Sequence, residues 1–588
     1  MTTTTPSNFR AHCAQLLLQA AAKILPDEVA ISVELQRPKL AAHGDYSSNL
    51  AMKLAKRVRR NPRELAQQLI DALPTSVHVE KAIVAGGGFI NFFLEKTAKQ
   101  LFLLEVLQAG KAFGQSKLGA GKSIQIEFVS ANPTGPLHVG HGRGAAFGAS
   151  LANIMAAAGY AVTREFYVND AGRQMDILTL STWLRYLALC DFNLPFPALA
   201  YQGQYVVAMA QKLHQMHGKH YARYAAAAMQ QLVEVSTSTK VNAEGEDAHL
   251  DALIAVAQSI LGEDYRYLHD FVLTEQLSDC RDDLLEFGVE FDNWFSEQSL
   301  FTSGKVAQAI QLLADKGLLY QQDGARWFRS TEFGDEKDRV VQRENGQYTY
   351  FASDIAYHLS KYERGFDAML NIWGADHHGY IARVKGAIEA LALDPNKLEI
   401  ALVQFAVLYR GENKVPMSTR SGEFVTLRQL RQEVGNDAAR FFYVLRKSDQ
   451  HLDFDLDLAK SQSNDNPVYY VQYAHARICS VLAQWGGDTN LLNSAETTLL
   501  IDPAEFSLLQ KMIDFPDTIE SAARERAPHM VAFFLRELAG EFHSYYNSTR
   551  FLVADESLTI ARLALISAIR QLIATGLLLL GVSAPHEM

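Results

Sequence analysis

The chain has 588 residues, of which 48% are hydrophobic and 21% charged, and its formal net charge is -11 at pH 7. This composition excludes a disordered or low-complexity protein, and the length corresponds to roughly three to five globular domains. The acidic balance argues against a generally basic nucleic-acid coat, although a large acidic enzyme can still present a local basic surface to RNA.

Cysteine usage and apolar stretches bear on the compartment. The cysteines stand far apart without a C-x-x-C pair, which disfavours a zinc site and a disulfide framework and suits a reducing cytoplasm. The opening MTTTTPSNFR lacks the apolar core of a signal peptide. The apolar stretch 560–582 raises the question of a membrane span, but Arg562, Arg570 and Gln571 interrupt it, so a buried helix is predicted. The four cysteines are Cys13, Cys190, Cys280 and Cys479.

Residues 1–110 are predicted to form a first domain. An opening helix has one apolar face, and the later segment AIVAGGGFINFFL supplies a glycine turn before an alternating strand. Between them, a polar turn leads into a helical stretch rich in cations. These cations fit a solvated helix face and an RNA-phosphate surface equally well. They are Lys53, Lys56, Arg57, Arg59, Arg60 and Arg63.

The segment 124–143 has the clearest local pattern in the chain. Alternating apolar residues at 124–128 predict a strand, prolines and a glycine end it, and a helix of small residues is predicted from Gly142. His138 and His141 therefore stand at the carboxyl end of a strand, where open α/β sheets bind nucleotides. Imidazole donors there would suit phosphate oxygens, and the alternative is that both are turn residues.

A second strand and a long insertion follow. AVTREFYV at 161–168 predicts a second strand of the sheet, and residues 172–340 are predicted to be a mostly helical insertion between two halves of the nucleotide fold. Glu344, Asn345 and Gly346 have the chemistry of a tight hairpin turn, which leads to Tyr350. Asp354 is predicted to start the next helix, where an aspartate is most often a cap.

The last part of the chain is predicted to contain a parallel strand, a polar loop and a helical domain. MLNIWG at 369–374 predicts the strand, and Asp376, His377 and His378 follow at its carboxyl end. A metal site is the weaker interpretation, because adjacent histidines point apart more readily than they chelate. From residue 463 onward the pattern is helical, and its first turns carry a cluster that could stack RNA bases or belong to the core. The cluster is Tyr469, Tyr470, Gln472, Tyr473, His475 and Arg477.

Several of these motifs resemble those of one known family. The sequence from His138 to His141, HVGH, resembles the HIGH signature of class I aminoacyl-tRNA synthetases, and SANPTGPLHVGHGR is similar to the arginyl-tRNA synthetase version of it. The amino-terminal segments and the later PVYYVQYAHARI and LGVSAPHEM are similar to the terminal domains of that family, with Gly87 where relatives often have proline. The resemblance runs from about residue 7 to the terminus and is weakest in the insertion.

The resemblance implies an α/β fold class. It implies a split parallel Rossmann-like nucleotide fold at 111–462, with the insertion at 172–340 and a signature loop at 414–422. An amino-terminal α+β tRNA-binding domain at 1–110 and a carboxyl-terminal all-helical anticodon-binding domain at 463–588 would flank it.

The resemblance also implies the reaction and its partners. L-arginine would be activated with ATP to arginyl-adenylate and transferred to the 3′ end of tRNA(Arg), with tRNA bound before activation. Mg²⁺ would accompany ATP with few protein ligands. We further expect no structural zinc, no DNA or membrane partner, a monomer and a cytoplasmic location.

The same resemblance assigns candidate site residues. Arginine would be bound by Glu127, Asn132, Tyr350 and Asp354. A carboxylate fork suits a planar cation that lysine cannot match, although Glu127 could instead make a structural hydrogen bond at the strand end. The ATP-binding residues would be His138, Gly140, His141, Gly374, Asp376, His377, Met417 and Ser418, and the catalytic residues would be His138, His141, Lys414 and Arg420.

One motif departs from the family pattern. Where class I synthetases have Lys-Met-Ser-Lys-Ser, this chain has Pro416, Met417, Ser418, Thr419 and Arg420, so both lysines are missing. Gly135 also stands where some relatives carry a compensating lysine, three residues before the first histidine. The hypothesis is that Lys414 or Arg420 supplies the cation.

Two alternative functions stay open on the sequence. One is a class I synthetase for another amino acid, such as cysteine. The other is a tRNA-binding paralogue that has lost catalysis, which would bind tRNA yet fail to exchange pyrophosphate.

Overall fold

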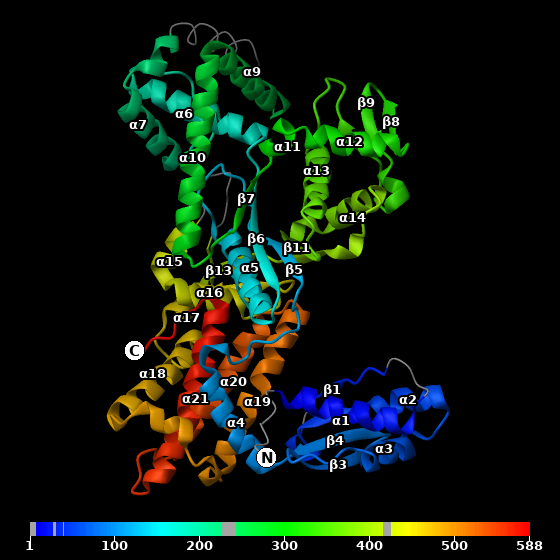
Figure 1. Ribbon diagram of the computed structural model, residues 1–588. Helices are drawn as coiled ribbons and strands as arrows, with labels where there is room; N and C mark the ends of the chain where they lie inside the picture. The colour runs from blue at the N-terminus through cyan, green and yellow to red at the C-terminus, as the bar shows by residue number, and fades with distance from the viewer. Residues whose placement is uncertain (1–7, 27–30, 39, 226–242, 416–424) are drawn as a thin grey trace. The chain divides into compact units, whose positions relative to one another are not determined.

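The computed structural model describes residues 8–588 apart from 27–30, 39, 226–242 and 416–424 (Figure 1). The chain separates into two compact units. The first combines the two ends of the chain, Met1–Leu118 and Gln462–Met588, with the short segment Ala157–Gly159. The second comprises Gly119–Ala156 and Tyr160–Ser461.

A five-stranded parallel sheet organises the second unit. Its order is β12-β11-β5-β6-β7, so chain direction across the sheet reverses between β5 and β11. Such a switch point creates a crevice at the carboxyl ends of the two central strands. The strands are β5 (Ser123–Glu127), β6 (Ala161–Val168), β7 (Asn293–Ser296), β11 (Ala368–Gly374) and β12 (Leu398–Val403).

Three of these strands confirm the sequence predictions at 124–128, 161–168 and 369–374. The helix after β5, α5 (Val139–Ala157), begins at Val139 rather than at the predicted Gly142. Its small residues allow close packing on the sheet: a Cβ at Gly148 would lie only 2.4 Å from Cδ2 of Phe128. The early start places His141 in the first helical turn.

The stretch 172–340 differs from the predicted helical insertion in its second half. Its first half is helical, as expected, and Figure 1 shows these helices in teal and green. However, β7 pairs in parallel with β6 and belongs to the main sheet, so this part is not outside the nucleotide fold. The elements before β7 are α6 (Arg173–Leu189), α7 (Gln204–His217), α9 (Ala243–Leu261) and α10 (Glu263–Glu286).

A small three-stranded antiparallel sheet follows β7 and corrects the predicted hairpin. The predicted turn forms, with Gly346 at φ 81°. Beyond it, Tyr348 makes only an isolated bridge to Gln342. The reason is that a helix already begins at Tyr350, so the pairing partner of β10 is β9. The elements are α11 (Gln298–Thr302), α12 (Lys305–Asp315), β8 (Leu319–Gln322), β9 (Ala325–Phe328), β10 (Arg339–Gln342) and α13 (Tyr350–Glu363).

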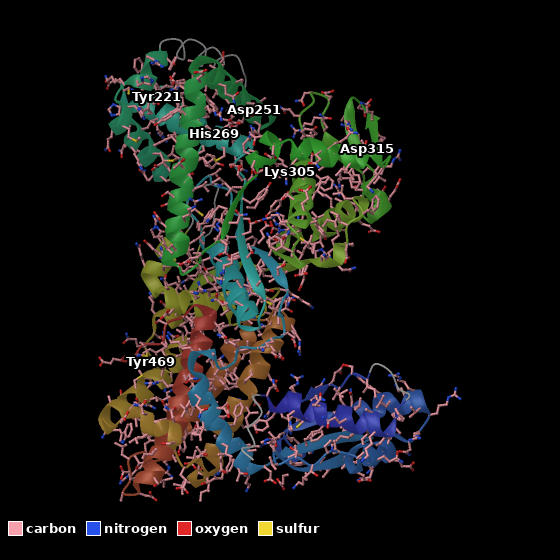
Figure 2. All side chains as sticks on the ribbon, viewed as in Figure 1. Tyr221, Asp251, His269, Lys305, Asp315 and Tyr469 are labelled. Carbon is pink, nitrogen blue, oxygen red and sulfur yellow. The ribbon has the colours of Figure 1, made fainter. Side chains whose placement is uncertain are left out.

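The remaining elements of the second unit follow β11 along the chain. Helix α14 follows β11, and the parallel pair β13–β15 forms a smaller sheet with β14. They are α14 (Ile381–Ala390), β13 (Ala406–Arg410), β14 (Asn413–Lys414), α15 (Leu427–Val434), α16 (Asn436–Val444), β15 (Leu452–Asp455) and α17 (Leu456–Lys460). Figure 2 shows the side chains, with Lys305 and Asp315 at the two ends of α12.

The amino-terminal part of the first unit is α+β, as predicted. Its antiparallel sheet has the order β1-β2-β4-β3. The predicted single basic helix is two helices, because Asn61 caps a new helix that starts at Pro62. The elements are α1 (Phe9–Ile24), β1 (Leu35–Gln36), β2 (Tyr46–Ser48), α2 (Leu50–Val58), α3 (Pro62–Asp71), β3 (Val79–Ala85), β4 (Phe89–Leu94) and α4 (Lys96–Ala109).

The carboxyl-terminal part of the first unit is helical, as predicted. The apolar stretch that raised the question of a membrane span forms one long helix, and 72% of its most apolar window is buried inside the protein. It packs against the other long helices and against α4, so the prediction of a buried helix is confirmed. The helices are α18 (Pro467–Trp485), α19 (Pro503–Arg524), α20 (His529–Ser548) and α21 (Glu556–Leu580).

Candidate active site

Two stacked histidines occupy the carboxyl end of β5. The ring centroids of His138 and His141 are 3.7 Å apart, and their planes differ by 21°. The backbone N–H of Gly140 donates to Nδ1 of His138 at 3.1 Å, and the N–H of His138 donates to Nδ1 of His141 at 3.3 Å. A Cβ at residue 140 would lie 2.8 Å from the His138 ring, so only glycine permits this arrangement.

These contacts define the chemistry that the pair offers. Burial lowers the pKa of His138, and burial and the neighbouring His138 lower the pKa of His141 to about 3. Both rings are therefore neutral near pH 7. Because each Nδ1 accepts a backbone hydrogen bond, the single ring proton lies on Nε2. The pair thus presents N–H donors suited to the oxygens of a polyphosphate.

The surrounding chain holds the histidine turn in place. The segment 425–427 pairs with it, since the Val139 N–H donates to the Val425 carbonyl at 3.1 Å. The Tyr205 hydroxyl at the start of α7 donates to the Thr134 carbonyl at 2.8 Å. Arg143 is fully buried and donates to three backbone carbonyls of the loops after β12 and α16. The helical insertion, through Tyr205, and the segment 425–427 that follows the signature loop therefore both support the turn.

A second cluster, the carboxylate pair Glu297 and Asp354, lies where β7 and α13 meet. Glu297 directly follows β7, is 2% exposed, and accepts a hydrogen bond from Ser353 at 2.6 Å on one oxygen. Its other oxygen is buried and has no hydrogen bond of ordinary geometry within the described residues, and the nearby Tyr167 hydroxyl acts against burial to lower the pKa of Glu297. Asp354 lies inside α13 and not at its start, so the cap interpretation is wrong. It accepts a hydrogen bond from the Tyr380 hydroxyl.

Burial dominates the electrostatics of this pair. Burial is the largest cause of the rise in the pKa of Asp354 to about 7, to which the nearby acids Glu297 and Glu127 also contribute, and burial raises the pKa of Glu297 as well. A buried carboxyl pair with an unused oxygen is a suitable receptor for a cation with several N–H donors. Sequence reasoning missed Glu297. The available signal was an acid directly after an apolar stretch, but NWFS is too short to predict a strand.

Tyr350 lies on the same helix as Asp354, about one turn before it. It is the first residue of α13, and its side chain is 55% exposed. Its hydroxyl approaches Gly172, where an added Cβ would lie 3.2 Å from it. The sequence placed Tyr350 in the hairpin and started the helix at Asp354, whereas the structure places both residues on α13.

Glu127 belongs to a buried polar network. Its Oε2 accepts from Lys361 Nζ at 2.5 Å and from the Tyr357 hydroxyl at 3.1 Å, and Lys361 is 0% exposed. Lys361 also donates to Asn371 at 2.6 Å. These contacts support the structural interpretation of Glu127 that the sequence left open. They tie β5, β11 and α13 together beneath the site.

Breaking this ion pair should destabilise the fold. We expect Lys361→Met to lower the free energy of unfolding by about 3–5 kcal/mol, because Glu127 would be left buried without a cation. The measurement is chemical unfolding followed by circular dichroism. The double variant Glu127→Gln/Lys361→Met should recover part of the loss. Equal destabilisation of single and double variants would contradict the explanation.

The other candidate substrate residues line the edge of the sheet. Asn132 is exposed and lies in a chain of amides: Asn169 donates to it at 3.1 Å, and it donates to Gln174 at 2.9 Å. Asp376 and His377 follow the end of β11 and are exposed, and His377 Nδ1 lies 3.2 Å from Asp376 Oδ1.

An aromatic side chain that the sequence did not flag completes the crevice. Phe405 is 46% exposed and lies against both Gly140 and Gly374, whose added Cβ atoms would be 3.2 Å and 3.6 Å from its ring. The structure thus brings the two glycines together across the switch point, although they are far apart in sequence.

The signature loop is described only at its edges. Lys414 is exposed at the end of the hairpin β13–β14. Met417, Ser418 and Arg420 lie outside the described residues. Over the described parts of the chain, no cluster of three or more histidine, cysteine or acidic side chains could hold a metal ion.

The two candidate RNA surfaces lie in the first unit. The six cations of α2, α3 and their connection are all exposed, and Lys53 pairs with Glu34 at 2.7 Å. In α18, Gln472 and His475 bind carbonyls of the terminal segment 583–585, which supports a structural role for them. Tyr469, labelled in Figure 2, stays half-buried. Both interpretations of each surface therefore remain.

Comparison with known proteins matches three regions of the chain to described families. Three family descriptions match: "Arginyl tRNA synthetase N terminal domain" at residues 11–94, "tRNA synthetases class I (R), catalytic domain" at 103–187 and 260–453, and "DALR anticodon binding domain" at 471–588. Arginine–tRNA ligases of Nitrosomonas eutropha and Nitrosomonas europaea are each 77% identical over 588 residues, which is 100% of both chains.

Two solved structures are also similar to this chain. A putative arginyl-tRNA synthetase from Campylobacter jejuni is 32% identical with a TM-score of 0.73, covering 84% of this chain and all of that one. The Thermus thermophilus arginyl-tRNA synthetase, 23% identical, shares the fold with a TM-score of 0.73 over 98% of this chain and 100% of its own.

Proposed function

This chain belongs to the arginyl-tRNA synthetases and acts as an arginine–tRNA ligase, and we propose that its histidine pair and its carboxylate pair carry the chemistry. The reaction joins L-arginine to ATP as arginyl-adenylate and then transfers the arginyl group to the 3′ end of tRNA(Arg). This membership decides against a synthetase for another amino acid, which the sequence alone had left open.

The carboxylate pair supports the choice of arginine. Glu297 and Asp354 are neighbours in a buried setting, and among the described residues one oxygen of Glu297 has no hydrogen bond of ordinary geometry, with the Tyr167 hydroxyl as its neighbouring donor. A guanidinium is planar and has five N–H donors, so it can satisfy two carboxylates at once, whereas the lysine ammonium is a point charge. Tyr350 would close over the guanidinium, and Asn132 would face the α-amino or carboxyl end. This pair is the single observation on which the site assignment depends.

The histidine pair would serve the activation step. An α-carboxylate oxygen of arginine forms a bond to the α-phosphorus of ATP, and the bond from that phosphorus to the bridging oxygen breaks, so that pyrophosphate leaves with the electron pair. The Nε2–H donors of His138 and His141 would stabilise charge that shifts to the phosphate oxygens. Gly140 and Gly374 leave room for the nucleotide, and its adenine would stack on Phe405.

The missing signature lysines require another cation. We expect Lys414→Ala and Arg420→Ala each to lower kcat of adenylate formation about tenfold or more while changing the ATP KM less, because the contact tightens in the transition state. Steady-state ATP–pyrophosphate exchange measures both constants. If neither variant is slower, another cation of the chain does this work.

The remaining assignments follow the same proposal. Mg²⁺ would enter with ATP and be held mainly by the phosphates, and no structural zinc is needed. The exposed cations of α2 and α3 and the tyrosines of α18 would contact tRNA(Arg). The protein would act as a monomer in the cytoplasm, without DNA or membrane partners.

The test is ATP–pyrophosphate exchange with each amino acid in turn, with and without total tRNA. Exchange with arginine alone, and only when tRNA is present, is the expected result. No exchange under any condition, with tRNA binding intact, would make the chain a tRNA-binding paralogue and overturn the proposal.

A further inference from the structure

Tyr380 contacts the carboxylate pair through its hydroxyl. It is the last residue of η5 (Ala375–Tyr380), which follows β11, and its hydroxyl donates to Oδ2 of Asp354. The two residues are brought together only by the packing of η5 and α14 on α13. Nothing in the assignments above gives this hydroxyl a function.

The Tyr380 ring is held firmly in place. Its edge meets the rings of Phe351 and Trp373, with centroids 6.3 Å and 5.9 Å apart. The guanidinium of Arg383, one turn along α14, lies 4.6 Å from the ring centroid. Arg383 in turn pairs with Asp335 at 3.3 Å. The hydroxyl is therefore directed at Asp354 by a fixed support.

That support is itself anchored. Arg339 forms two hydrogen bonds to Asp335, at 2.8 Å and 2.7 Å. The hydrogen bonds from Arg339, opposed by burial, lower the pKa of Asp335 to about 2. The Asp335 carboxylate therefore stays charged across the working pH range. Arg383 consequently keeps its position, and the Tyr380 ring keeps its cation contact.

We propose that Tyr380 is a positioning residue, which orients the Asp354 carboxylate for the guanidinium of arginine and favours its charged form by hydrogen bonding. This inference rests on the proposed function, because it takes Asp354 to be the arginine receptor. A hydroxyl that donates to a carboxylate stabilises the ionised state over the neutral one.

The groups around Asp354 set the direction of the effect. Glu297 after β7 and Glu127 at the end of β5 oppose its ionisation, and Arg383 on α14 favours it. On its own helix, burial keeps His358 neutral by lowering its pKa to about 3. Burial raises the pKa of Asp354 to about 7, and the Tyr380 hydrogen bond works against that rise. Loss of the hydroxyl should therefore raise the pKa of Asp354 further.

The test is the arginine KM of Tyr380→Phe in ATP–pyrophosphate exchange with tRNA, measured from pH 6.5 to 8.5. Phenylalanine keeps the ring that packs on Phe351 and Arg383. We expect the KM to rise about tenfold at pH 7 and progressively less as the pH increases, because Asp354 is again ionised there. The ATP KM and the thermal midpoint should change little.

Tyr362→Phe is the matched control. Tyr362 is also on α13, and its hydroxyl donates to the Asp394 carbonyl at 2.7 Å, away from the carboxylate pair. It should leave the arginine KM unchanged. An unchanged KM in Tyr380→Phe would overturn the inference, and a rise equal at every pH would overturn the effect of Tyr380 on the charge of Asp354. Failure of the wild-type enzyme to use arginine would instead refute the proposed function.

Discussion

Asp354→Asn should raise the arginine KM about a hundredfold or more in ATP–pyrophosphate exchange with tRNA. The reason is that truncating a buried, hydrogen-bonded charge pair costs about 2–5 kcal/mol. Glu297 alone cannot offer the same fork to the guanidinium. The ATP KM should stay within about threefold of wild type, because the nucleotide crevice is formed by other residues.

Asp394→Asn is a suitable control, because it changes an exposed aspartate that caps η6 (Pro395–Lys397) outside the site. It should leave the arginine KM unaltered. An unchanged arginine KM in Asp354→Asn would contradict the carboxylate pair as the receptor.

The substitution Asp354→Asn should also make the substrate-free protein more stable at neutral pH. The pKa of Asp354 is about 7 in the fold, against an ordinary value of 3.8, so the folded state holds this proton more tightly than the unfolded chain does. Its ionisation therefore weakens the fold progressively as the pH rises from about 4 to about 7, and no further above that. Asparagine removes the effect. The thermal midpoint of the variant should thus exceed that of wild type at pH 8, and the difference should shrink toward pH 4.

His141→Asn should lower kcat of adenylate formation about 100- to 1000-fold, with a much smaller change in the ATP KM. Asparagine places an oxygen close to the position of Nδ1, so it can still accept the His138 N–H, but it has no donor at the position of Nε2. Glutamine in His141→Gln instead places an N–H donor close to the position of Nε2 and has no acceptor at the position of Nδ1. This variant should therefore retain more activity. Exchange kinetics at saturating arginine and tRNA provide the measurement.

The pH profile tests the protonation state of the same histidine. With a pKa of about 3 for His141, kcat/KM for ATP, which reports the free enzyme, should show no titration of this group between pH 6 and 8. A wild-type limb near pH 6.5 that disappears in His141→Asn would contradict a neutral imidazole. His451→Asn is the control, because His451 is exposed and pairs with Asp453 at 2.8 Å, outside the site.

Local pattern accounts for what the sequence predicted well. Strand β5, the turn after it and helix α5 are specified by neighbouring residues, so the position of His138 and His141 at a strand end could be predicted. The resemblance of the same motif supplied the family. The helix of Asp354 was also predicted, but it begins four residues earlier, at Tyr350, so the placement of both residues on one helix was not predicted.

Two of the errors share a physical cause. Strand β7 has only the four residues NWFS, whose strand conformation depends on parallel pairing with β6. The predicted strand after the turn at 344–346 does not form, because α13 begins at Tyr350 and packs Phe351 and Ala352 into the core of the unit. In both cases long-range packing outweighed local preference.

The amino-acid sequence by itself determined the family, the reaction, the domain order and the strand, turn and helix that carry the histidines. Only the tertiary structure decided that Glu297 joins Asp354, that Lys361 neutralises Glu127 and that Tyr380 supports the receptor. Lys361 and Glu127 are 234 positions apart, and such contacts carry no local periodicity. They exist because a parallel sheet with helical crossovers brings the carboxyl ends of separate strands to one edge.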